Sequence, residues 1–167
     1  MNQLGIGRIV YCIFEHCFRI RAHEAQRTYF VFPPLIAPVK CSILPLIPNK
    51  EIGSFVQNIS KLIAVLFALE SMLTRAGVSS KIDDSGQTIG KRYARTDECG
   101  IPFAITVDFD TLADNTVTLR DLDTMKQVRM PIADLSSNIS QLSYAQKTWE
   151  DVCKQYPLFE AAAKDQE

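Results

Sequence analysis

The sequence predicts an α/β fold with three layers, in which helices flank a five-stranded mixed sheet. Two helical patterns each lie between short apolar runs, which makes two consecutive β-α-β units and therefore parallel strand pairing. A pair of alternating segments further along is typical of an antiparallel hairpin, so the sheet is mixed. The chain can bury one good core, because 47% of its 167 residues are hydrophobic and 22% are charged.

The first 32 residues resemble the last part of a larger domain more than an independent unit. They open with a Gly-Ile-Gly-Arg turn and continue into an amphipathic helix built on Ile9, Ile13, Phe14 and Phe18. This helix cannot bury its apolar face alone. The segment FPPLIAP then restricts the backbone to extended conformations and marks a boundary. The expected units are residues 1–32, 33–156 and a tail at 157–167.

The second unit contains the alternating elements. Its predicted strands lie at 39–44, 78–82, 103–107, 116–120 and 126–132, the last two joined by the polar turn DLDT. Its predicted helices lie at 52–75, 89–99, 134–144 and 148–156. Gly77 closes the first of these helices, and Trp149 is expected to anchor the last by packing.

The stretch IGKRYARTDECGIP at 89–102 is the most informative segment. Its apolar side is expected to dock inward, through Ile89, Tyr93 and Thr96. Its cations share another side through i,i+3 and i,i+4 spacing and are expected to face solvent: Lys91, Arg92 and Arg95. Gly100 suits the left-handed position after a helix, and Pro102 cannot continue it, so the helix is expected to end there.

Two interpretations of this basic helix stay open on the pattern alone. The cations can simply solvate an exposed face and pair with Asp97 or Glu98, as most surface charges do. Alternatively, Arg120 and Arg129 of the hairpin extend the same positive surface, with Tyr93 and Phe103 nearby. Guanidinium groups and aromatic rings suit single-stranded RNA, whose splayed bases stack on flat side chains. The net charge of -1 argues that any RNA-binding surface is a local patch.

Other chemistry finds little support in the sequence. The acidic stretch DFDTLADN lacks the glycine and the glutamate of a calcium loop. His16 and His23 have no carboxylate or cysteine partner at ligand spacing, so no metal site is expected. The five scattered cysteines fit reduced thiols of an intracellular compartment. Without a secretion signal in the sequence, a cytoplasmic location is the expectation.

Three segments carry a specific family resemblance: KCSILPL, VSSKIDDSGQTIGKRYARTDECGIPFAITVDFDT and TVTLRDLDTMKQVRMPI. They resemble the C-terminal anticodon-binding domain of the glycyl-tRNA synthetases, over nearly all of residues 32–156. The upstream run GIGRIVYCIFEHCF is similar to the end of that family's class II catalytic domain. The resemblance implies an anticodon-binding-domain fold, with a five-stranded mixed sheet flanked by helices.

The resemblance also implies functional residues. The tRNA-binding residues that it implies are Lys91, Arg92, Arg95, Arg120, Asp121, Asp123 and Arg129. The aspartates either orient the arginines or accept from a cytosine amino group, because the glycine anticodon is rich in cytosine. Gly5, Gly7 and Arg8 match the third class II motif, in which the arginine stacks on the adenine of ATP. No catalytic residue and no metal ligand is implied.

For function, the resemblance implies the C-terminal part of a glycine-tRNA ligase that recognises the anticodon of glycine tRNA. The resemblance also implies that the full-length protein uses ATP and magnesium, forms homodimers and acts in the cytoplasm. A mitochondrial form of the full gene product is compatible with it. Most of the catalytic domain is absent from this chain, so we expect it to need no cofactor and to make no aminoacyl-adenylate alone. No membrane partner is expected. The alternatives are a non-catalytic RNA-binding accessory or regulatory module and an oligomerisation module.

Two departures from the family pattern affect these expectations. Asn2 and Gln3 replace the Pro-Ser lead-in to the third motif, which removes part of the setting of Arg8. The run LIAVLFALESM resembles an insertion of about eleven residues, or about 16 Å of helix, which the β-α-β unit is expected not to absorb. A protruding interface helix, a local bulge and an incorrect gene model are the three explanations, the last being favoured. If the segment is real, its exposed apolar residues should promote association: Leu62, Phe67 and Leu69.

Overall fold

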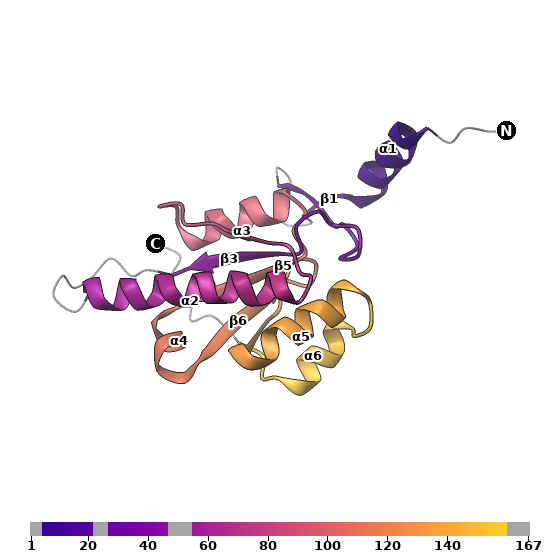
Figure 1. The fold of residues 1–167 in the computed structure, drawn as a ribbon. Coiled ribbons are helices and arrows are strands. Elements are labelled where there is room, and N and C mark those ends of the chain that lie inside the picture. Colours follow the sequence, from indigo (N-terminus) through magenta and orange to yellow (C-terminus); the bar gives the residue numbers. More distant parts are fainter. Residues whose placement is uncertain (1–4, 22–26, 47–54, 160–167) are drawn as a thin grey trace.

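The fold comes from a computed structural model that describes residues 5–21, 27–46 and 55–159 (Figure 1). These residues form a two-stranded sheet near the N-terminus and a separate five-stranded sheet with its helices. Asn2, Gln3, His23 and the end of the tail lie outside the described residues. The α/β class with a five-stranded mixed sheet is confirmed.

The N-terminal part consists of a helix and a short hairpin. Helix α1, Ile6–Cys17, projects away from the main body (Figure 1). It leads directly into β1, Phe18–Ile20, which pairs antiparallel with β2, Thr28–Phe30. The sequence analysis predicted the helix but missed the hairpin, and it placed Phe18 in the helix. Strands of three residues are too short to show an alternating pattern, which explains the omission.

The five-stranded sheet has the order β4-β3-β5-β6-β7. Strand β3 pairs parallel with β4 and β5, whereas β5, β6 and β7 pair antiparallel. The carboxyl ends of the three parallel strands therefore meet at one edge of the sheet. The strands are β3, Cys41–Pro45; β4, Ser80–Ile82; β5, Phe103–Val107; β6, Thr116–Asp121; and β7, Gln127–Pro131.

Helices cover both faces of this sheet. Helices α2 and α5 pack on the apolar face, and α3 packs on the other face against β3 and the N-terminal hairpin (Figure 1). Strands β4 and β5 lie on opposite sides of β3. Because both β-α-β connections are right-handed, their helices, α2 and α3, lie on opposite faces of the sheet. The helices are α2, Phe55–Arg75; α3, Ile89–Glu98; α4, Phe109–Asp114; α5, Ile132–Ser143; and α6, Trp149–Gln155.

Helix α4 was not predicted from the sequence. It begins at the acidic stretch that had been considered and rejected as a calcium loop. The side chain of Asp108 accepts from the backbone N–H of Thr111, and the Thr111 hydroxyl accepts from the N–H of Asp108, which forms a capping box. Asp108 therefore has a structural role as the N-cap of α4.

The apolar run in α2 belongs to the core, which corrects the expectation that the fold cannot absorb it. Leu62 and Leu69 are 0% and 1% exposed, and they share the buried face with Leu66 and Leu73. Phe67, at 63% exposed, lies on the outer face as expected. Helix α4 packs against α2 and covers part of it. Each fully buried leucine contributes about 1.5 to 3 kcal/mol, which gives the segment a structural role.

The face of the sheet beneath α3 is more polar than the α2 face. It carries Leu44 and Ala104 near α3, and then threonines and arginines towards β6 and β7: Thr106, Thr118, Arg120 and Arg129. Alternation along a strand places these residues opposite the apolar core. The arginines of β6 and β7 therefore lie together on this polar face.

Candidate nucleic-acid interface

A pocket lies at the carboxyl edge of the parallel strands, beside the N-terminal end of α3. It has a volume of about 400 Å³, and Pro45, Leu46 and Arg92 line one part of it. The loop before α3 lines the remainder, including Ser85, Gly86, Gln87 and Thr88. In α/β sheets, ligands bind outside the carboxyl ends of the strands. The position of this pocket therefore makes it the first candidate for a binding site.

The start of α3 leaves hydrogen-bond donors at this pocket. Thr88 is the N-cap residue, but its side chain makes no capping hydrogen bond. The first helical hydrogen bond runs from the N–H of Arg92 to the carbonyl of Thr88, so the preceding N–H groups have no acceptor within the helix. A helix N-terminus also carries a partial positive charge. The opening of α3 is therefore suited to electronegative groups.

Arg92 points inward, which corrects its predicted position on the solvent-facing side of α3. Only 5% of the residue is exposed. Its Nη1 donates to the carbonyl of Asp83 at 3.0 Å, and its Nη2 donates to the carbonyl of Pro45 at 2.6 Å. Its Nε is buried without a partner among the described residues, and the side chain lines the pocket. Burial lowers the pKa of the guanidinium, which nevertheless remains a cation at neutral pH.

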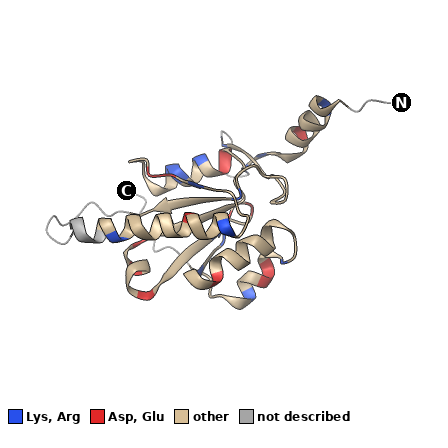
Figure 2. Ribbon diagram, in the orientation of Figure 1, with Lys and Arg blue, Asp and Glu red and all other residues tan. Residues whose placement is uncertain are grey.

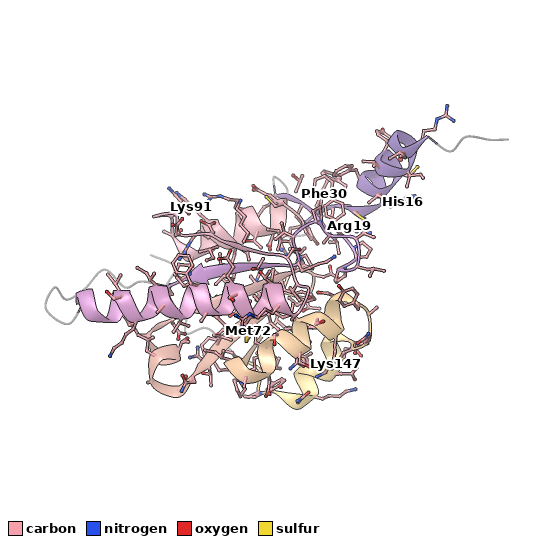
Figure 3. All side chains as sticks on the ribbon, in the orientation of Figure 1. His16, Arg19, Phe30, Met72, Lys91 and Lys147 are labelled. Atoms are coloured by element: carbon pink, nitrogen blue, oxygen red, sulfur yellow. The ribbon has the colours of Figure 1, made fainter. Side chains whose placement is uncertain are left out.

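Lys91 and Arg95 occupy the exposed positions that the sequence predicted. Lys91 points away from the sheet into solvent (Figure 3). Arg95 pairs with Asp83 at 3.2 Å, and its side chain keeps 47% of its surface exposed. Burial alone would raise the pKa of Asp83, but hydrogen bonds from Ser85 and the charge of Arg95 hold it below its ordinary value. Lys91 is therefore exposed to solvent, and Arg95 is half-exposed but held by Asp83 and by Ser85 of the pocket wall.

Charge is distributed unevenly along α3. In Figure 2 the first part of the helix carries the basic residues and its C-terminal end carries the acidic ones. At that end Asp97 is only 3% exposed and accepts from Arg120 at 3.0 Å and from Arg21 at 2.5 Å. The Arg120 guanidinium also lies 4.6 Å from the centre of the Tyr93 ring. Arg120 is thus an interior residue, contrary to the prediction that it extends a positive surface.

Arg129 is likewise tied to carboxylates. Its Nη1 and Nη2 donate to Asp108 at 2.6 and 3.1 Å, and its Nε donates to Thr116 at 2.6 Å. The side chain is 14% exposed. Burial alone would raise the pKa of Asp108, but the hydrogen bonds from Arg129 and Thr111 keep it below its ordinary value. Arg129 therefore has a fixed geometry and little net positive charge around it.

The two predicted aspartates differ in their surroundings. Asp121 accepts from the N–H and the hydroxyl of Thr124, at 2.9 and 2.8 Å, and so fixes the turn between β6 and β7. Burial raises the pKa of Asp121 above its ordinary value. Asp123 is exposed on the same turn. The structure thus places Asp121 in a structural position and leaves Asp123 accessible.

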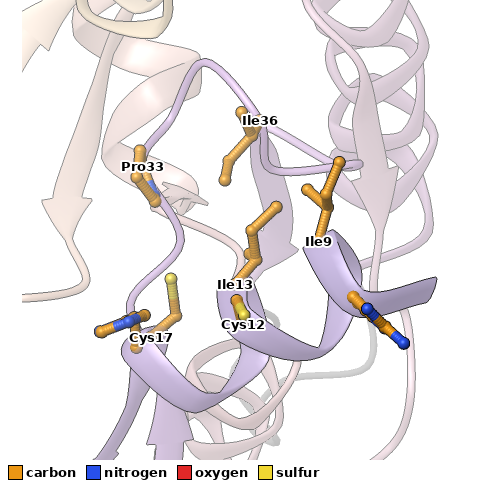
Figure 4. Close-up of a pocket in the computed structure, with 8 residues that line it drawn as sticks. Ile9, Cys12, Ile13, Cys17, Pro33 and Ile36 are labelled. Carbon is orange, nitrogen blue, oxygen red and sulfur yellow. The ribbon is translucent and has the colours of Figure 1, made fainter. Parts of the chain in front are cut away.

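The predicted ATP-site residues lie on α1, apart from the α3 pocket. Gly5 is the N-cap of α1, and Gly7 and Arg8 lie exposed in its first turn. Arg8 borders a pocket of about 370 Å³ lined mainly by Ile9, Cys12, Ile13, Cys17, Pro33 and Ile36 (Figure 4). This apolar lining offers few donors for a triphosphate. The residues present therefore do not fit ATP by themselves.

Several residues of the site escaped the sequence analysis. The unpaired N–H groups of α3 and the loop at 85–88 have no side-chain signature. Arg21 was missed because its partner, Asp97, lies 76 positions away. The Gln-Thr-Ile-Gly sequence before the basic residues was the available signal, since an N-cap threonine marks a helix start. An ion pair between residues far apart in the sequence, in contrast, produces no local sequence pattern.

Other kinds of site are not found among the described residues. Within 5–21, 27–46 and 55–159, no three His, Cys, Asp or Glu side chains gather as they would around a metal ion. All five cysteines are free, and burial raises the pKa of Cys41 to about 12, which makes this thiol unreactive. None of the helices in the described part of the chain is long and apolar enough to cross a membrane.

The fold and the pocket define an α/β domain with a donor-lined site at the carboxyl edge of a mixed sheet. Residues 40–142 match the family model described as "Anticodon binding domain". Since this match covers more than half of the chain, the chain belongs to the anticodon-binding domain family.

The chain is similar to part of three glycine–tRNA ligases. It is 52% identical to the glycine–tRNA ligase of Drosophila melanogaster and 50% identical to that of Bombyx mori, each over 95% of this chain and 20% of the relative. It is 47% identical to the glycine–tRNA ligase of Caenorhabditis elegans, over 96% of this chain and 21% of that protein. The chain therefore spans about a fifth of the length of these ligases and corresponds to their anticodon-binding part.

Proposed function

We propose that the chain binds the anticodon arm of glycine tRNA and that the pocket at the start of α3 receives an anticodon base. The observation that supports this proposal is the coincidence of a donor-lined pocket with two exposed cations, Lys91 and Arg95, on the adjoining turns of α3. Phosphate contacts hold a nucleic acid in register, and base contacts select its sequence. The two cations serve the first task and the pocket serves the second.

The pocket has the chemistry to read a base edge. It offers the N–H groups at the start of α3, which have no acceptor within the helix and can donate to a base. Cytosine presents acceptor atoms on its pairing edge, and proteins read splayed RNA bases through that edge. The glycine anticodon is rich in cytosine. Gln87 and Thr88 also line the pocket and add side-chain donors and acceptors.

The remaining predicted tRNA-binding residues divide into two roles in this proposal. Arg120, Asp121 and Arg129 position their neighbours through buried ion pairs and turn hydrogen bonds. Asp123 stands exposed on the β6–β7 turn, where it can accept from a base amino group. Arg92 acts from the wall of the pocket and not from the solvent face.

In the longer protein, we propose that this binding supports ATP- and magnesium-dependent attachment of glycine to its tRNA. Residues 1–32 then belong to the end of the catalytic domain and residues 33–156 to the anticodon-binding domain. The protein acts as a homodimer in the cytoplasm, with a mitochondrial form as a further product of the same gene. The chain alone forms no glycyl-adenylate, and the apolar pocket beside Arg8 supports that view.

The test is a titration of the chain with glycine tRNA and with the same tRNA carrying a swapped anticodon, at two salt concentrations. We expect the swap to weaken binding by about 1 to 3 kcal/mol for each base that is read. Lys91→Ala and Arg95→Ala should weaken the binding of both tRNAs and lower the salt slope by about one for each lost phosphate contact. Equal affinity of the wild type for both tRNAs would contradict anticodon recognition.

A matched control comes from lysines that lie away from α3. Lys154 is exposed on α6 and makes only a long contact with Asp151 at 3.8 Å. Lys154→Ala changes the net charge by the same amount as Lys91→Ala. If the two variants lost affinity equally, the effect would belong to overall charge and not to the α3 site.

A further inference from the structure

The segment 157–159, called here the C-terminal strap, extends the main sheet at its β7 edge. The N–H of Arg129 donates to the carbonyl of Pro157 at 3.2 Å, and the N–H of Phe159 donates to the carbonyl of Gln127 at 2.8 Å. Val128 and Leu158 form an antiparallel bridge. Residues paired across antiparallel strands share a face of the sheet. The strap therefore places Leu158 on the side of Val128, and Phe159 on the opposite, polar side.

On that polar side, Phe159 lies next to a guanidinium group that cannot move freely. The ring centre of Phe159 is 5.9 Å from the Arg129 guanidinium carbon. Hydrogen bonds to Asp108, Thr116 and Thr118 fix the guanidinium plane of Arg129. The Phe159 side is open, because 39% of this residue is exposed. The fixed guanidinium lies over the Phe159 ring, and the exposed part of the ring offers a flat surface to a partner.

This surface is connected to the α3 pocket through the carboxyl end of β5. Leu46 lines the pocket, and its N–H donates to the carbonyl of Val107 at 2.8 Å. Val107 is followed by Asp108, the residue that holds Arg129. Asp108 thus links the pocket end of β5 to Arg129, and Phe159 lies beyond Arg129, level with Gln127 of β7. A single strand of RNA that enters the pocket can follow this path.

We propose that Phe159 and Arg129 form a stacking platform for one unpaired base of the RNA, next to the base held in the α3 pocket. This inference rests on the proposed function. The contact is stacking and not phosphate binding, because Asp108 and Asp114, at 2.6 and 3.6 Å, offset the charge of Arg129. Every base has a π-face, so the platform adds affinity without reading sequence. Specificity remains with the pocket.

The test compares two substitutions in the strap, Phe159→Ala and Leu158→Ala, for binding to the anticodon stem-loop of glycine tRNA. Leu158 is the matched control because it is 57% exposed but lies on the opposite side of the same strap. We expect Phe159→Ala to weaken binding about tenfold, within the range of base–aromatic stacking, and to leave the salt slope unchanged. Leu158→Ala should bind as the wild type does. Unchanged affinity of Phe159→Ala would overturn the platform.

A second variant gives a direct signal of stacking. Phe159→Trp keeps a flat ring, and the chain has one native tryptophan, Trp149, whose emission in the wild type supplies the baseline. Adding the stem-loop should quench the new tryptophan by stacking, whereas Leu158→Trp should show no quenching. Quenching in neither variant, or equally in both, would contradict the proposal.

The outcomes separate this proposal from the proposed function. If the wild type discriminates between anticodons but Phe159→Ala binds normally, only the platform fails. If the wild type does not discriminate and Phe159→Ala still loses affinity, the chain stacks on RNA without reading the anticodon. Loss in both Phe159→Ala and Leu158→Ala would assign the effect to detachment of the strap, and the platform would be rejected.

Discussion

The two ends of helix α3 hold their charged side chains in opposite ways. At the N-terminal end Lys91 reaches solvent, beside a pocket where the first N–H groups of the helix have no helical acceptor. At the C-terminal end Asp97 is buried between Arg21 and Arg120, and Gly100 lies against Phe32. The first end is open to a partner, and the second joins α3 to the N-terminal hairpin and to β6.

This difference shows that the charge of a side chain does not by itself define a binding surface. Four of the five cations assigned to RNA contact are tied to groups of the chain itself: Arg92, Arg95, Arg120 and Arg129. A buried, paired arginine is expensive to extract, because its partner would stay behind as an uncompensated charge. The cations available for phosphate contact are those whose side chains retain solvent contact.

The largest expected effect comes from Asp97→Asn at the closed end. The substitution leaves Arg21 and Arg120 facing each other without a counter-ion, and Asp97 is 3% exposed. Removing one partner of a buried ion pair costs about 3 to 5 kcal/mol. Urea unfolding should show this loss as a lower midpoint at unchanged slope.

Asp123→Asn provides the control for that measurement. Asp123 is exposed on the β6–β7 turn, and surface substitutions of this kind stay within about 0.5 kcal/mol. If both variants unfolded at the same urea concentration, the ion pairs of Asp97 with Arg21 and Arg120 would not stabilise the fold as the geometry indicates.

A smaller loss is expected for Gly100→Ala, also at the closed end. Gly100 has a φ of +66°, and a Cβ there would lie 2.4 Å from Cδ2 of Phe32. Backbone strain of this kind costs about 1 to 3 kcal/mol, with the displacement of Phe32 in addition. Thermal unfolding should therefore start earlier than in the wild type.

Gly90→Ala gives the opposite sign at the open end of the same helix. A Cβ on Gly90 meets nothing within 4 Å, and alanine has the higher helix propensity by up to about 1 kcal/mol. A stability loss in Gly90→Ala as large as in Gly100→Ala would remove the contrast between the two ends.

The smallest expected effect belongs to Asp83→Asn at the open end. The pKa of Asp83 is lowered in the folded state, so its contribution is present above the unfolded value of about 3.9 and is lost as pH falls through the folded pKa. Arg95 is 47% exposed, which limits the contribution of the pair to less than about 1 kcal/mol. Unfolding curves of wild type and variant should differ slightly at neutral pH and converge in acid.

Much of the fold could be predicted because its signals are local. Apolar runs of strand length alternate with helical patterns, and Gly100 followed by Pro102 ends α3 where expected. The burial of Leu62 and Leu69 was missed because the run LIAVLFALESM was treated as additional to a fold of fixed size. The spacing of Leu62, Leu66, Leu69 and Leu73 has the helical period of a buried face, which was the signal available.

The candidate site was less predictable, because it depends on contacts between distant segments. Helical spacing put Arg92 on the same side as Lys91 and Arg95, yet the carbonyls of Asp83 and Pro45 draw it inward. The helical spacing of side chains gives no information about the carbonyl acceptors at the ends of neighbouring strands. The placement of Phe159 likewise depends on hydrogen bonds to β7, so no property of the residue itself marked it.

Amide hydrogen exchange along α3, with and without the anticodon stem-loop of glycine tRNA, tests the central claim most directly. The N–H groups of Gly90 and Lys91 have no acceptor within the helix and should exchange quickly in the free chain. We predict that RNA slows exchange at these two amides and leaves the hydrogen-bonded amides of Cys99 and Gly100 unchanged. Protection that appears only at Cys99 and Gly100, or at neither end, would contradict the account.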